Sequence, residues 1–149
     1  MFVKQLSLFL ENRSGRLVGA CNALATKGIN ILALSLADTA DFGILRLIVS
    51  DPDAGAAALK GAGFTVITND VLAIEVEDQP GGLAHVLNAL TKANVNIEYM
   101  YAFSSMVTKR APLIFRFEDN ERAVDAITAA GINVLKRVDL LDRPSNTKS

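Results

Sequence analysis

The chain has a single cysteine and a single histidine among its 149 residues, and this scarcity argues against several kinds of protein. One cysteine, Cys21, cannot form a disulfide within the chain. With one cysteine, one histidine and no clustered carboxylates, a metal ion would find few ligands, so we expect no metal site and no cofactor. Neither a nucleophile paired with a base nor a phosphate-binding loop is visible, so we expect no enzyme activity.

An excess of one charge is also missing, as is any long apolar run. Fifteen Lys and Arg against sixteen Asp and Glu give a formal net charge of −1, so no long-range field favours nucleic acid or an anionic membrane. No segment approaches the roughly 20 apolar residues of a membrane span. The first residues lack the features of a secretory signal, so we expect a cytoplasmic protein.

Half of the residues are apolar, enough for a substantial core, and their pattern occurs twice. Alternating runs typical of strands and runs with helical spacing follow one another as strand, helix, strand, strand, helix, strand, with expected strands at 3–10, 29–37, 43–50 and 64–68. The same order begins again at residue 71. Leu83 lies 66 residues after Leu17, and residues 111–134 align with 43–66 at an offset of 68. Two extra residues are therefore expected near 104–110.

This duplicated order predicts an α+β protein of two ferredoxin-like βαββαβ sandwiches, each with both helices on one face of an antiparallel sheet. We expect domain one at residues 1–70, domain two at 71–142, a short linker at 68–70 and a disordered tail at 143–149. A unit of about 70 residues has a marginal core and leaves a sheet face or edge uncovered. We therefore expect the two domains to pack as a pseudo-twofold pair.

The duplication includes a turn between a strand and a helix. Its copies are Asn12-Arg13-Ser14-Gly15-Arg16-Leu17 and Asp78-Gln79-Pro80-Gly81-Gly82-Leu83, and each opens with an Asx residue able to cap a helix. The first amides of a helix suit a carboxylate, and glycine lets a ligand approach the backbone. Arg16 would add a charge-assisted bond, while Asn30 and Asn96 each offer a donor and an acceptor. Plain capping, and turn roles for both asparagines, remain alternatives.

The sequence Asp78-x-Pro80-Gly81-x-Leu83, followed after one helix by Asn94-Val95-Asn96-Ile97, resembles the signature of ACT domains, and both repeats share in the resemblance. It implies a ferredoxin-like fold, domains that pair, and a small ligand, usually an amino acid, bound between the strand-to-helix loop of one domain and its partner. This chain resembles the stand-alone tandem type, which implies a regulatory, allosteric role and a metabolic enzyme as partner. The ligand-binding residues so implied are Asn12, Arg13, Ser14, Gly15, Arg16, Leu17, Asn30, Ile31, Asp78, Pro80, Gly81, Gly82, Leu83, Asn96 and Ile97.

The two copies of the turn differ, because Ser14 and Arg16 stand where the second copy has Pro80 and Gly82. We therefore expect two unequal sites. If only one is used, the arginine-bearing loop is expected to be the better carboxylate binder.

A row of aromatic residues marks a second expected surface. Ile97, Tyr99, Tyr101 and Phe103 alternate along one strand and are expected on one face, which would contact another chain in a homodimer or wall the ligand site. RNA-recognition modules share this topology, but the strand at 113–117 lacks their glycine-aromatic pattern. A structural protein–protein interaction module without a metabolite ligand is the competing function.

Two single residues have plain structural interpretations. His85 lies off the apolar stripe of its helix, so we expect a solvated side chain. Cys21 lies on the apolar stripe of the first helix and is expected to be a small core residue.

Overall fold

The computed structural model describes residues 2–38, 41–103, 110–136 and 139–140. The chain divides into two compact units: Lys4–Asn69, here the first unit, and Asp70–Ser149 together with Met1–Val3, here the second unit. The expected tail at 143–149 and most of the expected insertion at 104–110 lie outside the described residues.

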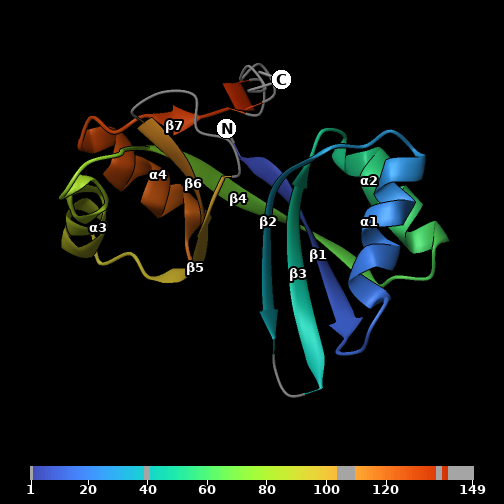
Figure 1. The fold of residues 1–149 in the computed structure, drawn as a ribbon. Coiled ribbons are helices and arrows are strands. Elements are labelled where there is room, and N and C mark those ends of the chain that lie inside the picture. Colours follow the sequence, from blue (N-terminus) through green and yellow to red (C-terminus); the bar gives the residue numbers. More distant parts are fainter. Residues whose placement is uncertain (1, 39–40, 104–109, 137–138, 141–149) are drawn as a thin grey trace. The chain divides into compact units, whose positions relative to one another are not determined.

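The first unit is an antiparallel sheet with two helices on one face (Figure 1). Its strands lie in the order β4-β1-β3-β2. They are β1 (Val3–Glu11), β2 (Ile31–Asp38), β3 (Phe42–Val49) and the first residues of β4 (Val66–Glu77), and the helices are α1 (Arg16–Thr26) and α2 (Pro52–Gly61).

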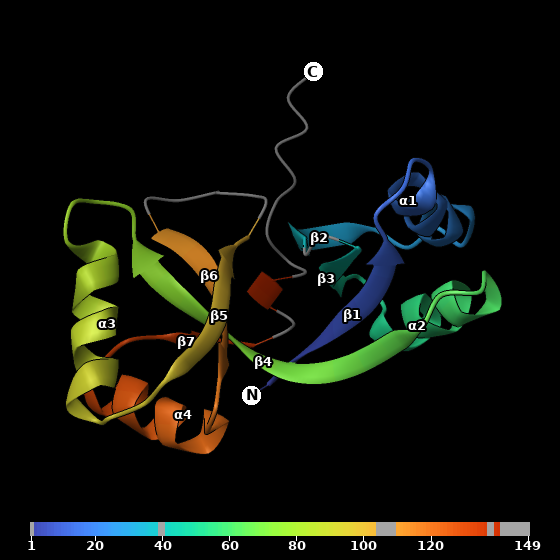
Figure 2. The same cartoon turned by 90° about the horizontal axis from the view of Figure 1, so that it is seen from below.

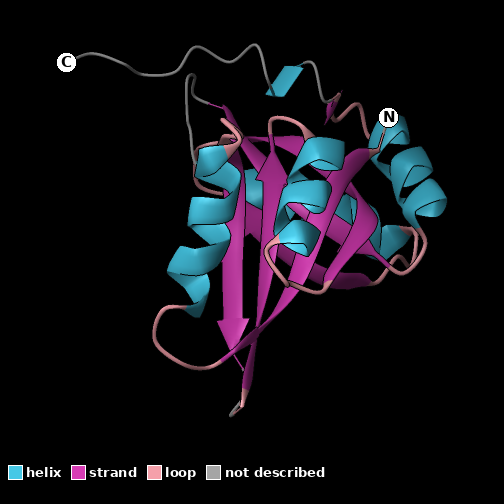
Figure 3. Cartoon of the chain, turned by 90° about the vertical axis from the view of Figure 1, so that its right-hand side faces the viewer, coloured by secondary structure: helices cyan, strands magenta, loops and turns pink. Residues whose placement is uncertain are grey.

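The second unit repeats this arrangement. The remainder of β4 lies in the order β7-β4-β6-β5, and both helices again lie together on one side of the strands (Figure 2). The further elements are α3 (Gly82–Lys92), β5 (Ile97–Ala102), β6 (Arg110–Phe117), α4 (Asn120–Ala129) and β7 (Val134–Leu135). Figure 3 shows helices packed against strands, so the predicted α+β class with βαββαβ repeats is confirmed.

Each unit has its own core between sheet and helices, built by the alternation along its central strand. In the first unit, Leu6, Leu8 and Leu10 of β1 belong to a cluster with residues of α1 and α2. In the second unit the corresponding residues of β4 are Leu72, Ile74 and Val76. Side chains two residues apart share a sheet face, and burying each large one stabilises the fold by about 1.5–3 kcal/mol.

Strand β4 is longer than the sequence predicts. The expected strands at 64–68 and 71–77, with a linker between them, are one strand of 12 residues, Val66–Glu77. Asn and Asp are poor strand formers, which is why residues 68–70 were expected to break the strand.

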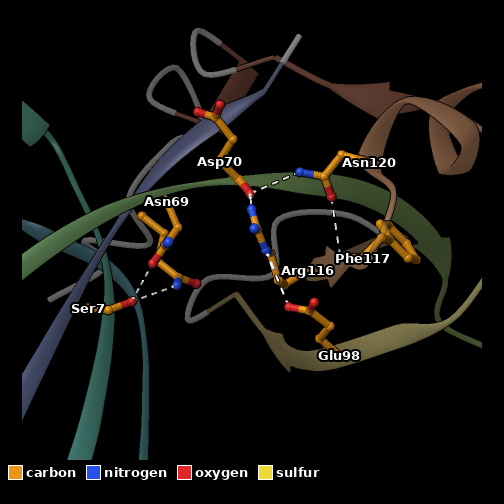
Figure 4. Close-up of polar contacts among 8 residues, drawn as sticks. Ser7, Asn69, Asp70, Glu98, Arg116, Phe117 and Asn120 are labelled. Carbon is orange, nitrogen blue, oxygen red and sulfur yellow. Dashed lines mark hydrogen bonds and ion pairs between the residues drawn. The ribbon is translucent and has the colours of Figure 1, made fainter.

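Hydrogen bonds satisfy these polar positions while the backbone stays extended (Figure 4). In the first unit, Ser7 Oγ donates to Asn69 Oδ1 at 3.0 Å. In the second unit, Arg116 Nη1 and Asn120 Nδ2 donate to the Asp70 carbonyl oxygen at 2.6 and 3.1 Å. The polar residues are thus accommodated within the strand instead of ending it.

The helix caps also differ from expectation. Asn12 and Asp78 do not cap, because α1 and α3 begin after Gly15 and Gly81, and neither helix has a side-chain cap bond. Asx caps occur instead at the other two helices, where the side chain of Asp51 accepts from Ala54 N and that of Asp119 accepts from Arg122 N. An N-cap side chain reaches amides two or three positions ahead, and Asn12 and Asp78 lie too far before their helices.

The expected aromatic row is interrupted by a register shift in β5. The pairing with β6 shifts between Ile97 and Tyr99, so Ile97 packs with Met100 against the core on the helix side. A bulge adds one residue and thereby exchanges the faces of the residues that precede it. Tyr99 and Tyr101 are half-buried on the other face. In α1, the half-buried Cys21 is less enclosed than expected, since Ala20 and Leu24 are the buried residues.

Removing the Asp119 carboxylate tests the assignment of caps. We expect Asp119→Ala to lower the free energy of unfolding by about 1 kcal/mol, because α4 loses its side-chain cap. The matched variant Asp78→Ala, in the same unit, should change it by less than about 0.5 kcal/mol. Urea unfolding at equilibrium measures both, and equal losses would contradict the assignment.

Candidate functional site

The turn before α3 is a type II β-turn. Gly82 N donates to Gln79 O at 3.0 Å, and Gly81, in the third position, has φ 84° and ψ −6°. Proline is favoured in the second position of such a turn and glycine in the third. Pro80 therefore precedes the helix and does not supply its first residue.

The turn before α1 has the same form. Arg16 N donates to Arg13 O at 3.4 Å, and Gly15 has φ 90° and ψ −17°. The hydrogen bond that opens the helix is also the same in both copies. Gly19 N donates to Gly15 O at 3.0 Å, and His85 N donates to Gly81 O at 3.0 Å. The two copies thus share a backbone conformation although Ser14 replaces proline.

Residue 82 and its counterpart, residue 16, differ in the room available for a side chain. A Cβ built on Gly82 would overlap the carbonyl oxygen of Glu77, so that turn admits only glycine. In the first copy, the hydrogen bond from Arg16 N to Arg13 O is longer, at 3.4 Å, and the corresponding position is occupied by Arg16.

Each turn lines a pocket within its own unit. The second-unit pocket has a volume of about 420 Å³ and the first-unit pocket about 200 Å³. The second-unit pocket is lined by Glu75, Val76, Glu77, Gln79, Pro80, Gly81, Gly82, His85, Val86, Gly131, Ile132 and Asn133. The first-unit pocket is lined by Leu10, Glu11, Asn12, Arg13, Arg16, Leu17, Leu36 and Gly43.

The pockets include only part of the predicted residue set. Four predicted residues line the first-unit pocket, namely Asn12, Arg13, Arg16 and Leu17. Three line the second-unit pocket, namely Pro80, Gly81 and Gly82. Four belong to the turns without lining these pockets, namely Ser14, Gly15, Asp78 and Leu83. The other four, Asn30, Ile31, Asn96 and Ile97, lie elsewhere.

The strand register places Asn30 far from the turn of its own unit. Glu11, next to the turn, pairs with Phe42 at one end of β3, whereas Ile31 pairs with Val49 at the other end. At about 3.3 Å per residue, the length of β3 separates them by more than 20 Å. Arg16 and Asn30 of one unit therefore lie too far apart to contact the same small ligand within that unit.

The second unit has the same separation. Glu77 pairs with Arg110 and Ile97 with Phe117, at opposite ends of β6. The left-handed residue after α3 is Asn94, with φ 55°, which corresponds to Gly28 with φ 69°. The left-handed turn role therefore belongs to Asn94 and not to the asparagine beside Ile97.

The two pockets differ in charge. Among the described residues, the lining of the second-unit pocket has two carboxylates, Glu75 and Glu77, and no Lys or Arg. Asn133 Nδ2 donates to Glu75 Oε2 at 3.3 Å, and Gln79 Nε2 donates to Glu77 Oε2 at 2.6 Å. The second-unit pocket thus favours a cationic group.

The first-unit pocket has two arginines in its lining. The carboxylate of Glu11 lies 2.9 Å from Arg13 Nε in an exposed ion pair, which leaves Arg16 as the other charged group. The first-unit pocket has the opposite charge preference to the second.

Several lining residues were missed by sequence reasoning, notably Glu75, Glu77 and the loop 131–133. The predicted strand order could have identified these residues. The fourth strand of each repeat is antiparallel to the first and starts beside its end, which brings the loop 131–133 next to Glu75 and Glu77. His85 is exposed, and it lines the pocket. In the described part of the chain, no group of three or more His, Cys, Asp or Glu side chains is arranged to hold a metal ion. None of the described helices is long and apolar enough to cross a membrane.

Comparison with known proteins gives a family match and similar structures. Residues 1–143 match the family model described as an ACT domain pair. The structure of a protein from Bacteroides thetaiotaomicron is similar with a TM-score of 0.89 and 42% identity, covering 95% of this chain and 97% of that one. A comparison with curated proteins finds no match.

Two regulatory subunits of aspartate kinase have the same fold at lower identity. The ligand-free subunit from Thermus thermophilus has a TM-score of 0.62 and 20% identity, covering 85% of this chain and 91% of that one. The subunit from Thermus flavus has a TM-score of 0.58 and 19% identity, covering 86% and 92%.

The left-handed glycine of the turn can be tested by adding a methyl group. We expect Gly81→Ala to lower the free energy of unfolding by about 1–2 kcal/mol, because an alanine at positive φ is strained. Gly61→Ala is the matched control, since Gly61 ends α2 at ordinary φ with open space around its Cα. Chemical unfolding of both variants measures the difference, and a fully stable Gly81→Ala protein would argue against the turn described here.

Proposed function

The chain belongs to the family of ACT domain pairs, and from this premise we propose that it is a cytoplasmic regulatory or sensor protein that binds a small amino acid. The observation that carries the proposal is the duplicated turn, because each copy lines a pocket beside the start of a helix. Glycines at the third position of each turn leave the backbone accessible to a ligand.

The proposed contacts follow from where the predicted residues lie. Residues of the two turns contact a ligand within their own unit. Asn30, Ile31, Asn96 and Ile97 lie at the far end of their sheets, so they reach a turn-bound ligand only if it is held against a second copy of the chain. This is the arrangement that the ACT resemblance implies.

The proposed role is regulation of a metabolic enzyme. The similar fold of the aspartate kinase regulatory subunits supports a partner of this kind. Regulation requires that the ligand bind one of two packing states more tightly than the other, and that the partner distinguish between them.

We also propose that the chain forms a homodimer, and its exposed apolar side chains support this. Leu34 and Leu36 are each 50% exposed on β2, the last strand in the order of the first unit, and Phe42 is 51% exposed nearby in the chain. A strand at the end of a sheet with exposed leucines is an unfavourable surface for a monomer in water.

Thermal unfolding in the presence of each proteinogenic amino acid tests the ligand proposal. At about 100 times its dissociation constant, a ligand adds roughly 2.7 kcal/mol, which raises the melting temperature by roughly 5–10 °C for a chain of this size. The shift should be lost in Gly15→Asp or Gly81→Asp, depending on which turn binds. If no amino acid shifts the transition, the competing function as an interaction module without a metabolite is favoured.

Sedimentation tests the homodimer. We expect Leu34→Ser/Leu36→Ser to sediment as a monomer at concentrations where the wild type is a dimer, because the edge loses its apolar side chains. Tyr99→Ala/Tyr101→Ala is the comparison, since it changes the aromatic surface indicated by the sequence. A monomer with the tyrosine variant and a dimer with the leucine variant would place the contact at the aromatic face instead.

A further inference from the structure

Two side chains of the first unit are stacked beside its strand-to-helix turn. The guanidinium carbon of Arg16 lies 4.6 Å from the centroid of the Phe64 ring, a cation–π distance. Phe64 is 7% exposed, and its Cζ would lie 3.5 Å from a Cβ built on Gly19. The ring therefore fills the space between residue 16 and residue 19.

Each of these positions has a counterpart in the second unit that lines the 420 Å³ pocket. Arg16 corresponds to Gly82 and Gly19 to His85 at the offset of 66, and Phe64 corresponds to Ile132 at the offset of 68.

The local backbone agrees with this correspondence. Phe64 N donates to Leu59 O at 3.0 Å, as Ile132 N does to Ile127 O at 3.1 Å, and the preceding Gly63 and Gly131 both have positive φ. Comparable backbones thus hold side chains of different size around the same space.

We propose that Arg16 and Phe64 fill, in the first unit, the space that forms the pocket in the second unit. The chain then has one ligand site of this kind, in the second unit, and its ligand carries a cationic amino group. This inference rests on the proposed function and deepens it by naming the site, the number of sites and the charge of the group that is bound.

The preference for a cation follows from two independent features. The described lining of the second-unit pocket has the carboxylates of Glu75 and Glu77 and no Lys or Arg. In the first unit, the corresponding space contains a cation supplied by the chain itself, the guanidinium of Arg16. Its Nε is buried and has no hydrogen-bond partner among the described residues, and the guanidinium lies over the face of the Phe64 ring.

This geometry favours the second unit over the arginine-bearing loop that the sequence suggested. The guanidinium of Arg16 is engaged with Phe64, which reduces its availability to a ligand carboxylate. Gly82, at the position that corresponds to Arg16, places no side chain in the second-unit pocket.

The first experiment closes the second-unit pocket or removes its charge. Isothermal titration and thermal unfolding are carried out with L-amino acids and with their N-acetyl derivatives, which lack the ammonium charge. We expect one molecule bound per chain, at least tenfold weaker binding of the N-acetyl form, and a loss of binding in Ile132→Phe. The double variant Glu75→Gln/Glu77→Gln should weaken binding at least tenfold, whereas Glu121→Gln, an exposed carboxylate outside the pocket, should not.

The second experiment opens the first unit by giving it the residues of the second. In Arg16→Gly/Phe64→Ile, confirmed as folded by circular dichroism, we expect the number of bound molecules per chain to rise from one towards two. A number that stays at one would overturn the role given to Arg16 and Phe64.

The outcomes separate this inference from the proposed function. If an amino acid shifts the melting temperature of the wild type but the shift survives in Ile132→Phe and in the Glu75→Gln/Glu77→Gln variant, the site is wrong and the proposed function stands. Two molecules per wild-type chain would also overturn the inference. If no amino acid shifts the wild type, the proposed function itself fails.

Discussion

The structure depends on a glycine in the left-handed conformation at the end of each repeat's first strand. Gly15 and Gly81, with φ of 90° and 84°, let the chain leave the sheet and begin a helix within one tight turn. A side chain at positive φ is strained, so other residues would favour a wider connection. The short connection keeps the start of the helix next to the central strand of its unit, and the pocket of each unit forms at that place.

The order of elements could be predicted from the sequence because it depends on local signals. Alternation marked β1 and β3, and Asp51-Pro52 is a local helix-start signal at which α2 does begin, with Asp51 accepting from Ala54 N. The offsets of 66 and 68 showed the duplication without any structural knowledge. Local propensity and repetition together were enough to identify the βαββαβ class.

The remaining features could not be predicted because they depend on contacts distant in sequence. Whether Asn69 and Asp70 end a strand is decided by Ser7 and Arg116, which the local pattern does not reveal. The shift beside Ile97 depends on pairing with β6. The separation of Asn30 from the turn follows from the register of β3. Likewise, Glu75 joins the pocket lining only because the antiparallel order brings residues 131–133 beside it.

One further consequence follows from the continuous strand β4, whose 12 residues run from the first unit into the second. In the first unit it is the outermost strand of the order, and in the second unit it pairs with both β6 and β7. A protease cut or a gene boundary near residue 69 would therefore not release two intact modules, because it would divide a strand that both sheets need. The two halves recur in sequence, but they share the residues of one strand.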